Sequence, residues 1–200
     1  MQQLLVATNN PHKLKELELE LRQLELRIST PSEAGVSPDF DVEETGATFA
    51  ENAELKARAF AAQTRLPSLA DDSGLVVDAL GGEPGVHSKR RIEGSDHDRN
   101  IHLLKKLDGQ ADRSAKFVTV LALYLPDSDQ LHFFEGSVSG KIGDGERGSE
   151  GFGYDPLFIP DGYTQSFGEL ALDVKSTLSH RHRALEKLRQ YLEKESLPKE

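Results

Sequence analysis

Two long stretches rich in β-branched and aromatic residues, 115–125 and 130–138, constrain the fold more than any other feature of this chain. The Pro-Asp-Ser-Asp segment between them is a turn signal, so the two stretches predict a pair of long antiparallel strands. Shorter apolar runs predict further strands at 4–7, 26–29, 68–71, 75–80 and 157–159. The chain must therefore build a sheet in which a β-hairpin joins several short strands.

Helix-start signals lie between the short strands. Asn10 can serve as an N-cap with Pro11 in the first helical position, and leucines then recur at helical spacing as far as Leu24. Capping signatures and apolar periodicity predict three more helices, at about 48–64, 95–107 and 176–194. Strands and helices in this mixture, parallel early and antiparallel late, indicate an α/β or α+β domain built on a mixed sheet.

The charge and composition exclude several classes of protein. The formal net charge of −10 argues against non-specific electrostatic binding to nucleic acid or anionic lipid, since both require a basic protein surface. The 200 residues include no cysteine, which excludes thiolate metal sites and suits a reducing compartment, so the cytoplasm is the expected location. No apolar run approaches the roughly 20 residues of a membrane span. We expect one domain over 1–195 and a C-terminal tail at 196–200.

The loop after the first strand carries residues that suit phosphate. Thr8, Asn10 and Lys13 combine a hydroxyl, an amide and an ammonium with the free N–H groups expected at a helix start. Ordinary helix capping beside a solvated lysine explains the same residues. Lys56 lies four residues after Asn52 and shares a helix face with it, so it is either a second ligand-binding lysine or an exposed one.

Asp71 and Asp72 place two carboxylates where a predicted strand ends and the turn 72–74 begins. Adjacent residues of a strand face opposite sides, so only one aspartate is expected to face a ligand while the other braces the turn. A polar turn without a catalytic role is the alternative. Glu43 and Glu44 of the loop 31–46 can supply another carboxylate to magnesium, which prefers one or two carboxylates with water and phosphate. Solvation of an acidic loop is the simpler explanation of these glutamates taken alone.

The segment Gly-Phe-Gly-Tyr-Asp-Pro at 151–156 joins two aromatic rings to glycines that permit close backbone approach. This combination suits the stacking of a base and the donation of N–H groups to its edge, but a glycine-rich loop with packed aromatics explains it equally well. A dinucleotide fingerprint is excluded because a proline and a strand follow the segment. Basic residues gather at 179–183, where His180 and His182 lack the i, i+4 spacing of a helical metal site.

Six segments in this order resemble the inosine and xanthosine triphosphate pyrophosphatases, which remove deaminated purine nucleotides. They are T-N-N-P-H-K at 8–13, E-E-T-G-A-T-F-A-E-N-A-E-L-K-A at 43–57, A-D-D-S-G-L at 70–75, P-G-V-H-S-K-R at 84–90, G-F-G-Y-D-P at 151–156 and K-S-T-L-S-H-R at 175–181. Each segment alone is weakly specific, whereas the ordered set is highly specific.

The resemblance implies an α/β fold with an elongated mixed β-sheet flanked by helices, two lobes with a central cleft, and a homodimer. It implies Mg²⁺ as the cofactor, Asp72 as the catalytic base and a metal ligand, and Glu44 as the other metal ligand. The triphosphate would contact Thr8, Asn9, Asn10, Lys13, Lys56 and Ser73. The purine would contact Phe152, Gly153, Tyr154, Asp155, Lys175, His180 and Arg181, and Arg90 is a further active-site candidate.

The expected reaction is hydrolysis of ITP, dITP or XTP to the monophosphate and pyrophosphate, which keeps these nucleotides out of DNA and RNA. Water oriented by Asp72 would attack the α-phosphorus, and N–H donors would recognise the C6 oxygen that replaces the amino group of adenine. The chain departs from the family pattern at His87, in the basic run 89–91 and at Val174. The alternatives are a related pyrophosphatase for modified pyrimidine nucleotides and a non-catalytic nucleotide sensor.

Overall fold

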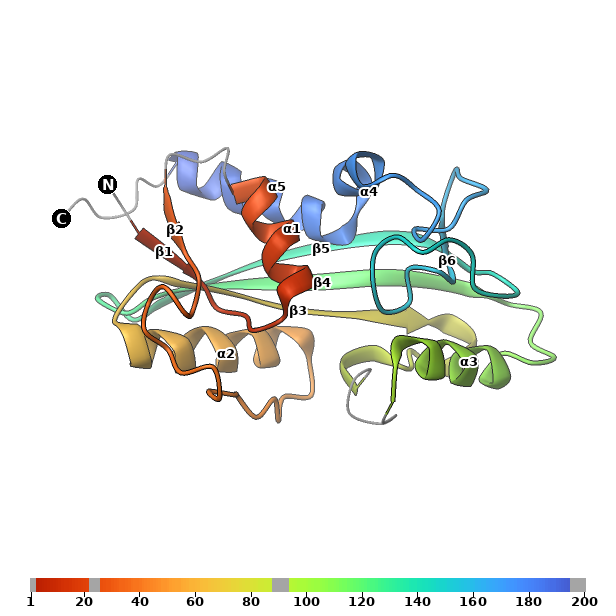
Figure 1. Cartoon of the computed structure of the whole chain (residues 1–200), viewed down its shortest axis with the longest axis horizontal. Coiled ribbons are helices and arrows are strands. Elements are labelled where there is room, and N and C mark those ends of the chain that lie inside the picture. Colours follow the sequence, from red (N-terminus) through yellow and green to blue (C-terminus); the bar gives the residue numbers. More distant parts are fainter. Residues whose placement is uncertain (1–2, 22–25, 88–93, 195–200) are drawn as a thin grey trace. The chain divides into compact units, whose positions relative to one another are not determined.

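The computed structural model describes residues 3–21, 26–87 and 94–194, and these form a six-stranded sheet in the order β2-β1-β3-β4-β5-β6 (Figure 1). The strands are β1 (Gln3–Val6), β2 (Arg27–Ser29), β3 (Ser68–Val77), β4 (Ser114–Leu125), β5 (Gln130–Ile142) and β6 (Phe158–Pro160). β1 pairs in parallel with β2 and β3, whereas β5 and β6 are antiparallel, so the predicted mixed sheet is confirmed.

The helices are α1 (Pro11–Leu21), α2 (Phe49–Thr64), α3 (Asp96–Lys106), α4 (Leu172–Leu178) and α5 (His180–Lys194), with short 3-10 turns at Asp78–Leu80 and Gly85–His87. Three of them begin where the sequence predicts. α1 begins at Pro11 after the Asn10 cap, and a local capping box fixes the start of α2 and of α3. Thr48 accepts a hydrogen bond from the N–H of Glu51, and Ser95 accepts one from that of Asp98. None of the helices in the described ranges is long and apolar enough to cross a membrane.

The chain divides into two compact units. Unit 1 comprises Met1–Asp72, Thr119–Gly136 and Arg181–Glu200, and unit 2 comprises Ser73–Val118 and Ser137–His180. The strands β3, β4 and β5 therefore contribute residues to both units. The predicted tail 196–200, Leu24 of the first predicted helix and Arg90 lie outside the described residues.

In unit 1, helices cover both faces of the sheet, with α1 and α5 on one face and α2 on the other (Figure 1). Leu4 and Val6 belong to the buried cluster beneath α1 and α5, whereas Leu5 and Ala7 belong to the cluster beneath α2. This division follows from the alternation of side chains along a strand. Burial of both faces explains why residues 4–7 are a continuous apolar run.

Unit 2 has a core of its own, in which aromatic rings are prominent. The ring centroids of Phe117 and Phe158 are 4.7 Å apart, and those of Phe158 and Phe167 are 5.2 Å apart. Leu103 of α3 packs into the same cluster, and Leu178 of α4 packs against it. This core supports the loop between β5 and β6, which contains the segment 151–156.

The turn predicted at 72–74 is wrong, because β3 continues through it to Val77. The Asp-Ser-Gly sequence is a local turn signal, but the place of this segment beside β4 in the sheet overrides it; β1, the other neighbour of β3, pairs with it only at Ser68 and Leu69. The residues predicted as the end of the following strand, 78–80, form a 3-10 turn instead. Asp71 and Asp72 therefore lie inside a strand and not at its end.

Two other boundaries differ from the predictions. The last helix is divided at Ser179, whose extended backbone (φ −67°, ψ 159°) ends α4 and lets α5 begin at His180. β5 runs past residue 138, where the predicted strand ends, through Gly140 and as far as Ile142. A Cβ at Gly140 would lie 2.3 Å from the carbonyl oxygen of Ile159, so the close approach of β6 requires glycine here.

Candidate active site

The loop after β1 is organised by the capping of α1. Oδ1 of Asn10 accepts hydrogen bonds from the N–H groups of His12 (3.0 Å) and Lys13 (3.4 Å), and Oγ1 of Thr8 accepts one from the N–H of Asn10 (3.2 Å). The prediction of free N–H groups at this helix start is therefore wrong, because the cap occupies them. An anion at this loop would rely on the ammonium of Lys13.

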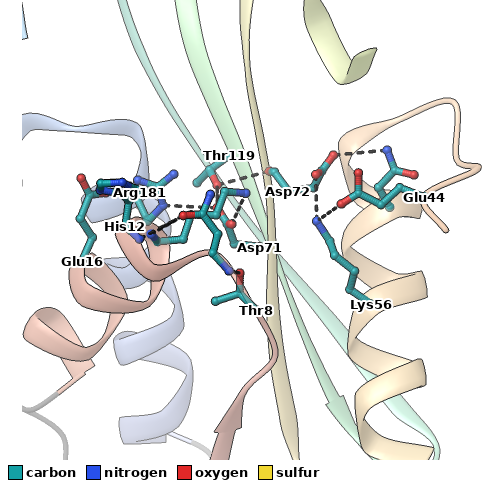
Figure 2. A network of polar contacts seen from close by, with 12 residues as sticks. Thr8, His12, Glu16, Glu44, Lys56, Asp71, Asp72, Thr119 and Arg181 are labelled. Atoms are coloured by element: carbon teal, nitrogen blue, oxygen red, sulfur yellow. Dashed lines mark hydrogen bonds and ion pairs between the residues drawn. The ribbon is translucent and has the colours of Figure 1, made fainter. Parts of the chain in front are cut away.

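Asp71 and Asp72 point to opposite sides of β3 (Figure 2), as strand alternation predicts. The carboxylate of Asp71 is buried and forms ion pairs with Lys13 of α1 and, at 3.3 Å, with Nε of Arg181 of α5. Arg181 also forms an ion pair with Glu16 of α1. This side of β3 therefore carries two cations that are matched by two carboxylates.

Asp72 meets a different set of residues on the side of α2 (Figure 2). Nζ of Lys56 donates to Oδ1 of Asp72 at 2.9 Å and to Oε1 of Glu44 at 2.7 Å. Nδ2 of Asn52 lies 3.3 Å from Oδ2 of Asp72, while its Oδ1 accepts from the N–H of Gly46. Asn52 and Lys56 thus share one helix face, as predicted from their spacing, and both contact the same aspartate.

Thr119 of β4 fixes the main chain of β3 at the aspartate pair. Its Oγ1 donates to Oδ2 of Asp71 at 2.9 Å and lies 3.3 Å from the carbonyl oxygen of Asp72. Neither Thr119 nor Glu16 was predicted. Nothing local in the sequence indicates Glu16, because its partner Arg181 lies 165 positions away. Thr119 looks like any β-branched residue of a buried strand.

The two aspartates differ in their pKa values. Burial alone would raise the pKa of Asp71, but the charges of Lys13 and Arg181 hold it well below its ordinary value. Burial does raise the pKa of Asp72, against the opposing charge of Lys56. The cations thus favour the ionised form of Asp71, whereas Asp72 is the better proton acceptor.

The two lysines also differ in their pKa values. Burial lowers the pKa of Lys13 although Asp71 is adjacent. Burial would likewise lower the pKa of Lys56, but the carboxylates of Asp72, Asp71 and Glu44 raise it. Lys56 is therefore the lysine whose positive charge is more firmly retained.

Glu44 and Asp72 form a pair of oxygen ligands that fits a small cation. Both carboxylates contact one ammonium group, so both can reach a cation in that region. Within the described ranges there is no group of three or more His, Cys, Asp or Glu residues that could hold a metal ion. Two carboxylates fit magnesium, which takes its other ligands from water and phosphate. Glu43, the other candidate, is exposed.

In unit 2, the segment 151–156 folds around the carboxylate of Asp155. Its Oδ2 accepts from the N–H of Phe152 at 2.8 Å and from Nζ of Lys175 at 2.7 Å, and the Lys175 ammonium lies 5.3 Å from the centroid of the Phe152 ring. Gly151 has φ 76°, and a Cβ there would lie 2.1 Å from Oδ2 of Asp155. The loop therefore requires glycine at this position.

The aromatic residues predicted to contact a base differ in how deeply their rings are buried. Tyr154 is buried in the core of unit 2, which leaves the half-buried Phe152 as the ring better placed for stacking. His180 is buried and stacks on Phe117, with ring centroids 4.8 Å apart and planes 12° apart. The N–H of Gly153 donates to Asp96 at 2.7 Å. The N–H groups of Phe152 and Gly153, expected to face a base, thus donate to carboxylates of the protein.

The remaining predicted site residues lie in several places. Asn9 is exposed, and its Nδ2 donates to the carbonyl oxygen of Phe40 at 2.7 Å. Ser73 follows Asp72 on β3 and is half-buried. Arg181 was grouped with Lys175 and His180, but it belongs to unit 1 and contacts carboxylates there, whereas the other two belong to unit 2.

The mixed sheet and its helices make this an α/β protein. In its candidate site, the carboxylates of two aspartates lie against the ammonium groups of two lysines. The chain belongs to the Ham1 family, whose model matches residues 4–191. It is 47% identical over 197 residues to a dITP/XTP pyrophosphatase of Deinococcus deserti, and the match covers 98% of this chain and 91% of that protein.

Solved structures of similar proteins support the same assignment. The HAM1 protein from Coxiella burnetii is 40% identical with a TM-score of 0.89, and the match covers 98% of this chain and 100% of that one. The Ham1 protein of Staphylococcus aureus is 40% identical with a TM-score of 0.85, with 96% and 99% covered. The predicted α/β class and family resemblance are confirmed.

Proposed function

We propose that this protein hydrolyses deaminated purine nucleoside triphosphates, such as ITP, dITP and XTP, to the monophosphate and pyrophosphate. The observation that carries the proposal is the environment of Asp72, whose pKa is raised and which shares the ammonium of Lys56 with Glu44. Membership of the Ham1 family and the likeness to proteins named dITP/XTP pyrophosphatases support it. Such hydrolysis would remove these nucleotides before they enter DNA or RNA.

Asp72 is the residue that acts on water in this mechanism. Asn52 and Lys56 hold its carboxylate, which orients a water molecule toward the α-phosphorus and accepts a proton from it. The raised pKa of Asp72 favours this step, because a proton acceptor works best when its pKa lies nearer the working pH. The bond from the α-phosphorus to the bridging oxygen then breaks, and pyrophosphate leaves.

The two lysines beside the aspartate pair bind the triphosphate. Lys56, whose pKa is raised, places a firm positive charge where negative charge develops on the phosphate oxygens. Lys13 adds a second ammonium at the loop after β1, where Thr8 and Asn10 fix the start of α1. Asn9, Ser73 and Arg90 are assigned to the substrate by the resemblance alone.

We assign Mg²⁺ to Glu44 and Asp72. When bound, the ion would neutralise charge on the phosphate oxygens. The support for this assignment is that both carboxylates converge on one cation, the ammonium of Lys56, and offer the oxygen ligands that magnesium prefers.

Phe152 and Lys175 select the base. Phe152 offers a ring for stacking, and the buried Lys175 offers N–H groups to the C6 oxygen of hypoxanthine or xanthine. Adenine has an amino group at C6 and would leave such a donor unpaired, which costs about 1–3 kcal/mol. This energy corresponds to roughly 5- to 150-fold discrimination between the two bases.

The assembly and location of the protein are also proposals. A homodimer is supported by the family resemblance alone. A cytoplasmic location is supported by the absence of cysteine, which suits a reducing compartment. The net charge of −10 supports a protein that acts on free nucleotides and does not bind nucleic acid.

The test is phosphorus NMR of the purified protein with dITP and magnesium. We expect dIMP and pyrophosphate in equal amounts, and loss of turnover with retained dITP binding in Asp72→Asn. Release of orthophosphate would contradict the proposed reaction. Faster hydrolysis of dTTP or UTP than of dITP and XTP would favour the pyrimidine alternative, and binding of dITP without turnover would favour the nucleotide sensor.

A further inference from the structure

The first turns of α3 hold the backbone of Gly153 on both sides. The N–H of Gly153 donates to Oδ2 of Asp96 at 2.7 Å, and Nδ2 of Asn100 donates to the carbonyl oxygen of Gly153 at 3.1 Å. All three residues belong to unit 2. Gly153 directly follows Phe152, the ring assigned to the base, and has a left-handed backbone (φ 64°). The path of the loop at this point is thus set by α3.

The side chain of Asn100 is buried and held in its contact with the carbonyl oxygen of Gly153. It is 1% exposed, and its amide nitrogen donates to Oε1 of Glu146 at 2.7 Å as well as to Gly153. Its Oδ1 is buried and has no hydrogen-bond partner among the residues that the structure describes. A buried acceptor without a partner lowers stability. The two N–H groups of its amide are therefore what makes asparagine suited to this position, because they reach Glu146 and Gly153 together.

The groups that hold Gly153 are themselves anchored. Oε2 of Glu146 lies 2.6 Å from Nδ1 of His97, so the carboxylate that orients Asn100 is fixed at both oxygens. The carboxylate of Asp96 receives the N–H of Gly153 on one oxygen and forms an ion pair with Arg99 on the other. Anchoring of this kind is what a precisely placed binding group needs, because errors of a few tenths of an ångström weaken hydrogen bonds.

We propose that Asp96 and Asn100 are positioning residues for base selection. They fix the backbone of Gly153 and thereby aim the ring of Phe152 and the pair formed by Asp155 and Lys175. The inference rests on the proposed function, because it assigns the choice among purine triphosphates to that loop. Neither residue contacts the substrate in this account; both act through the position of the loop.

The experiment compares kcat/KM for dITP with kcat/KM for dATP in Asn100→Asp. This isosteric change replaces the amide donor by an oxygen that faces the Gly153 carbonyl and the Glu146 carboxylate. We expect the dITP to dATP ratio to fall about tenfold, the effect of one lost hydrogen bond. The matched control, His102→Ala on the exposed face of α3, should keep the wild-type ratio. A role limited to folding lowers both values in proportion, so an unchanged ratio in Asn100→Asp would overturn the proposal.

A second pair of variants tests Asp96. Asp96→Asn keeps an acceptor oxygen for the N–H of Gly153 and should hold the ratio within about threefold of wild type, whereas Asp96→Ala should lose about tenfold. Equal ratios in these two variants would overturn the role of Asp96. Failure of the proposed function and failure of the positioning role give different results. A wild-type protein that releases no pyrophosphate from dITP refutes both of them. An active wild type with unchanged ratios in every variant refutes only the positioning role.

Discussion

Replacing Asp71 with asparagine removes the negative charge that two buried cations share. The side chains of Lys13 and Arg181 are 13% and 3% exposed, and both form ion pairs with Asp71. Asparagine has nearly the same shape, and its amide oxygen can still accept the hydrogen bond from Thr119. The substitution therefore tests the charge of Asp71 with little change in packing.

The expected loss of stability follows from these contacts. Removal of one partner from a buried ion pair costs about 3–5 kcal/mol, because the other charge is left uncompensated. Arg181 keeps Glu16 as a partner, and Lys13, whose pKa burial already lowers, can release its proton. Both effects reduce the cost, so we expect the free energy of unfolding to fall by about 3 kcal/mol. With a urea dependence of about 2 kcal/mol per molar, the unfolding midpoint falls by about 1.5 M.

Asp72→Asn is the matched variant on the opposite side of the same strand. Burial raises the pKa of Asp72, so its ionised form is held in the folded state at a cost that asparagine does not share. We expect its free energy of unfolding to change by less than about 1 kcal/mol, while turnover is lost. The assay is urea unfolding followed by circular dichroism at pH 7. Equal losses in the two variants, or a larger loss in Asp72→Asn, would refute the division of roles between the aspartates.

Three further predictions concern pH, metal and the loop segment 151–156. Because the folded-state pKa of Asp71 lies well below its unfolded value, its stabilisation is present above about pH 4 and is lost as the pH falls through the folded value. Acid unfolding of Asp71→Asn should therefore be less steep than that of wild type, and parallel curves would contradict this. Glu44→Gln should raise the half-saturating Mg²⁺ concentration about tenfold or more in activity titrations, whereas the exposed control Glu43→Gln should not. Gly151→Ala places a methyl against Asp155 at a left-handed position, so it should cost about 1–3 kcal/mol in thermal unfolding; a stability equal to wild type would show that the loop tolerates a side chain.

Features fixed by short-range chemistry were predictable from the sequence. The capping boxes at Thr48 and Ser95 set two helix starts with side chains three residues apart, and no distant partner is needed. The break at Ser179 was missed because apolar residues recur on both sides of it. The turn signal at 72–74 misled for the opposite reason, since strand pairing with distant segments outweighs a local preference.

The candidate site was predictable only in part. Strand alternation anticipated that Asp71 and Asp72 face opposite sides, and helical spacing anticipated the common face of Asn52 and Lys56. The ion pair between Asp71 and Arg181 joins residues 110 positions apart, and nothing local in the sequence indicates it. The pKa difference between the aspartates likewise depends on cations that only the folded chain brings to each of them.

The central claim is that Asp72 drives pyrophosphate release from a deaminated purine triphosphate. The most direct measurement is phosphorus NMR of dITP turnover by wild type and Asp72→Asn, with binding of dITP to each measured in parallel. The account predicts pyrophosphate and dIMP from wild type, and bound but unhydrolysed dITP in the variant. Turnover in Asp72→Asn within about tenfold of wild type, less than the usual contribution of a general base, would contradict it.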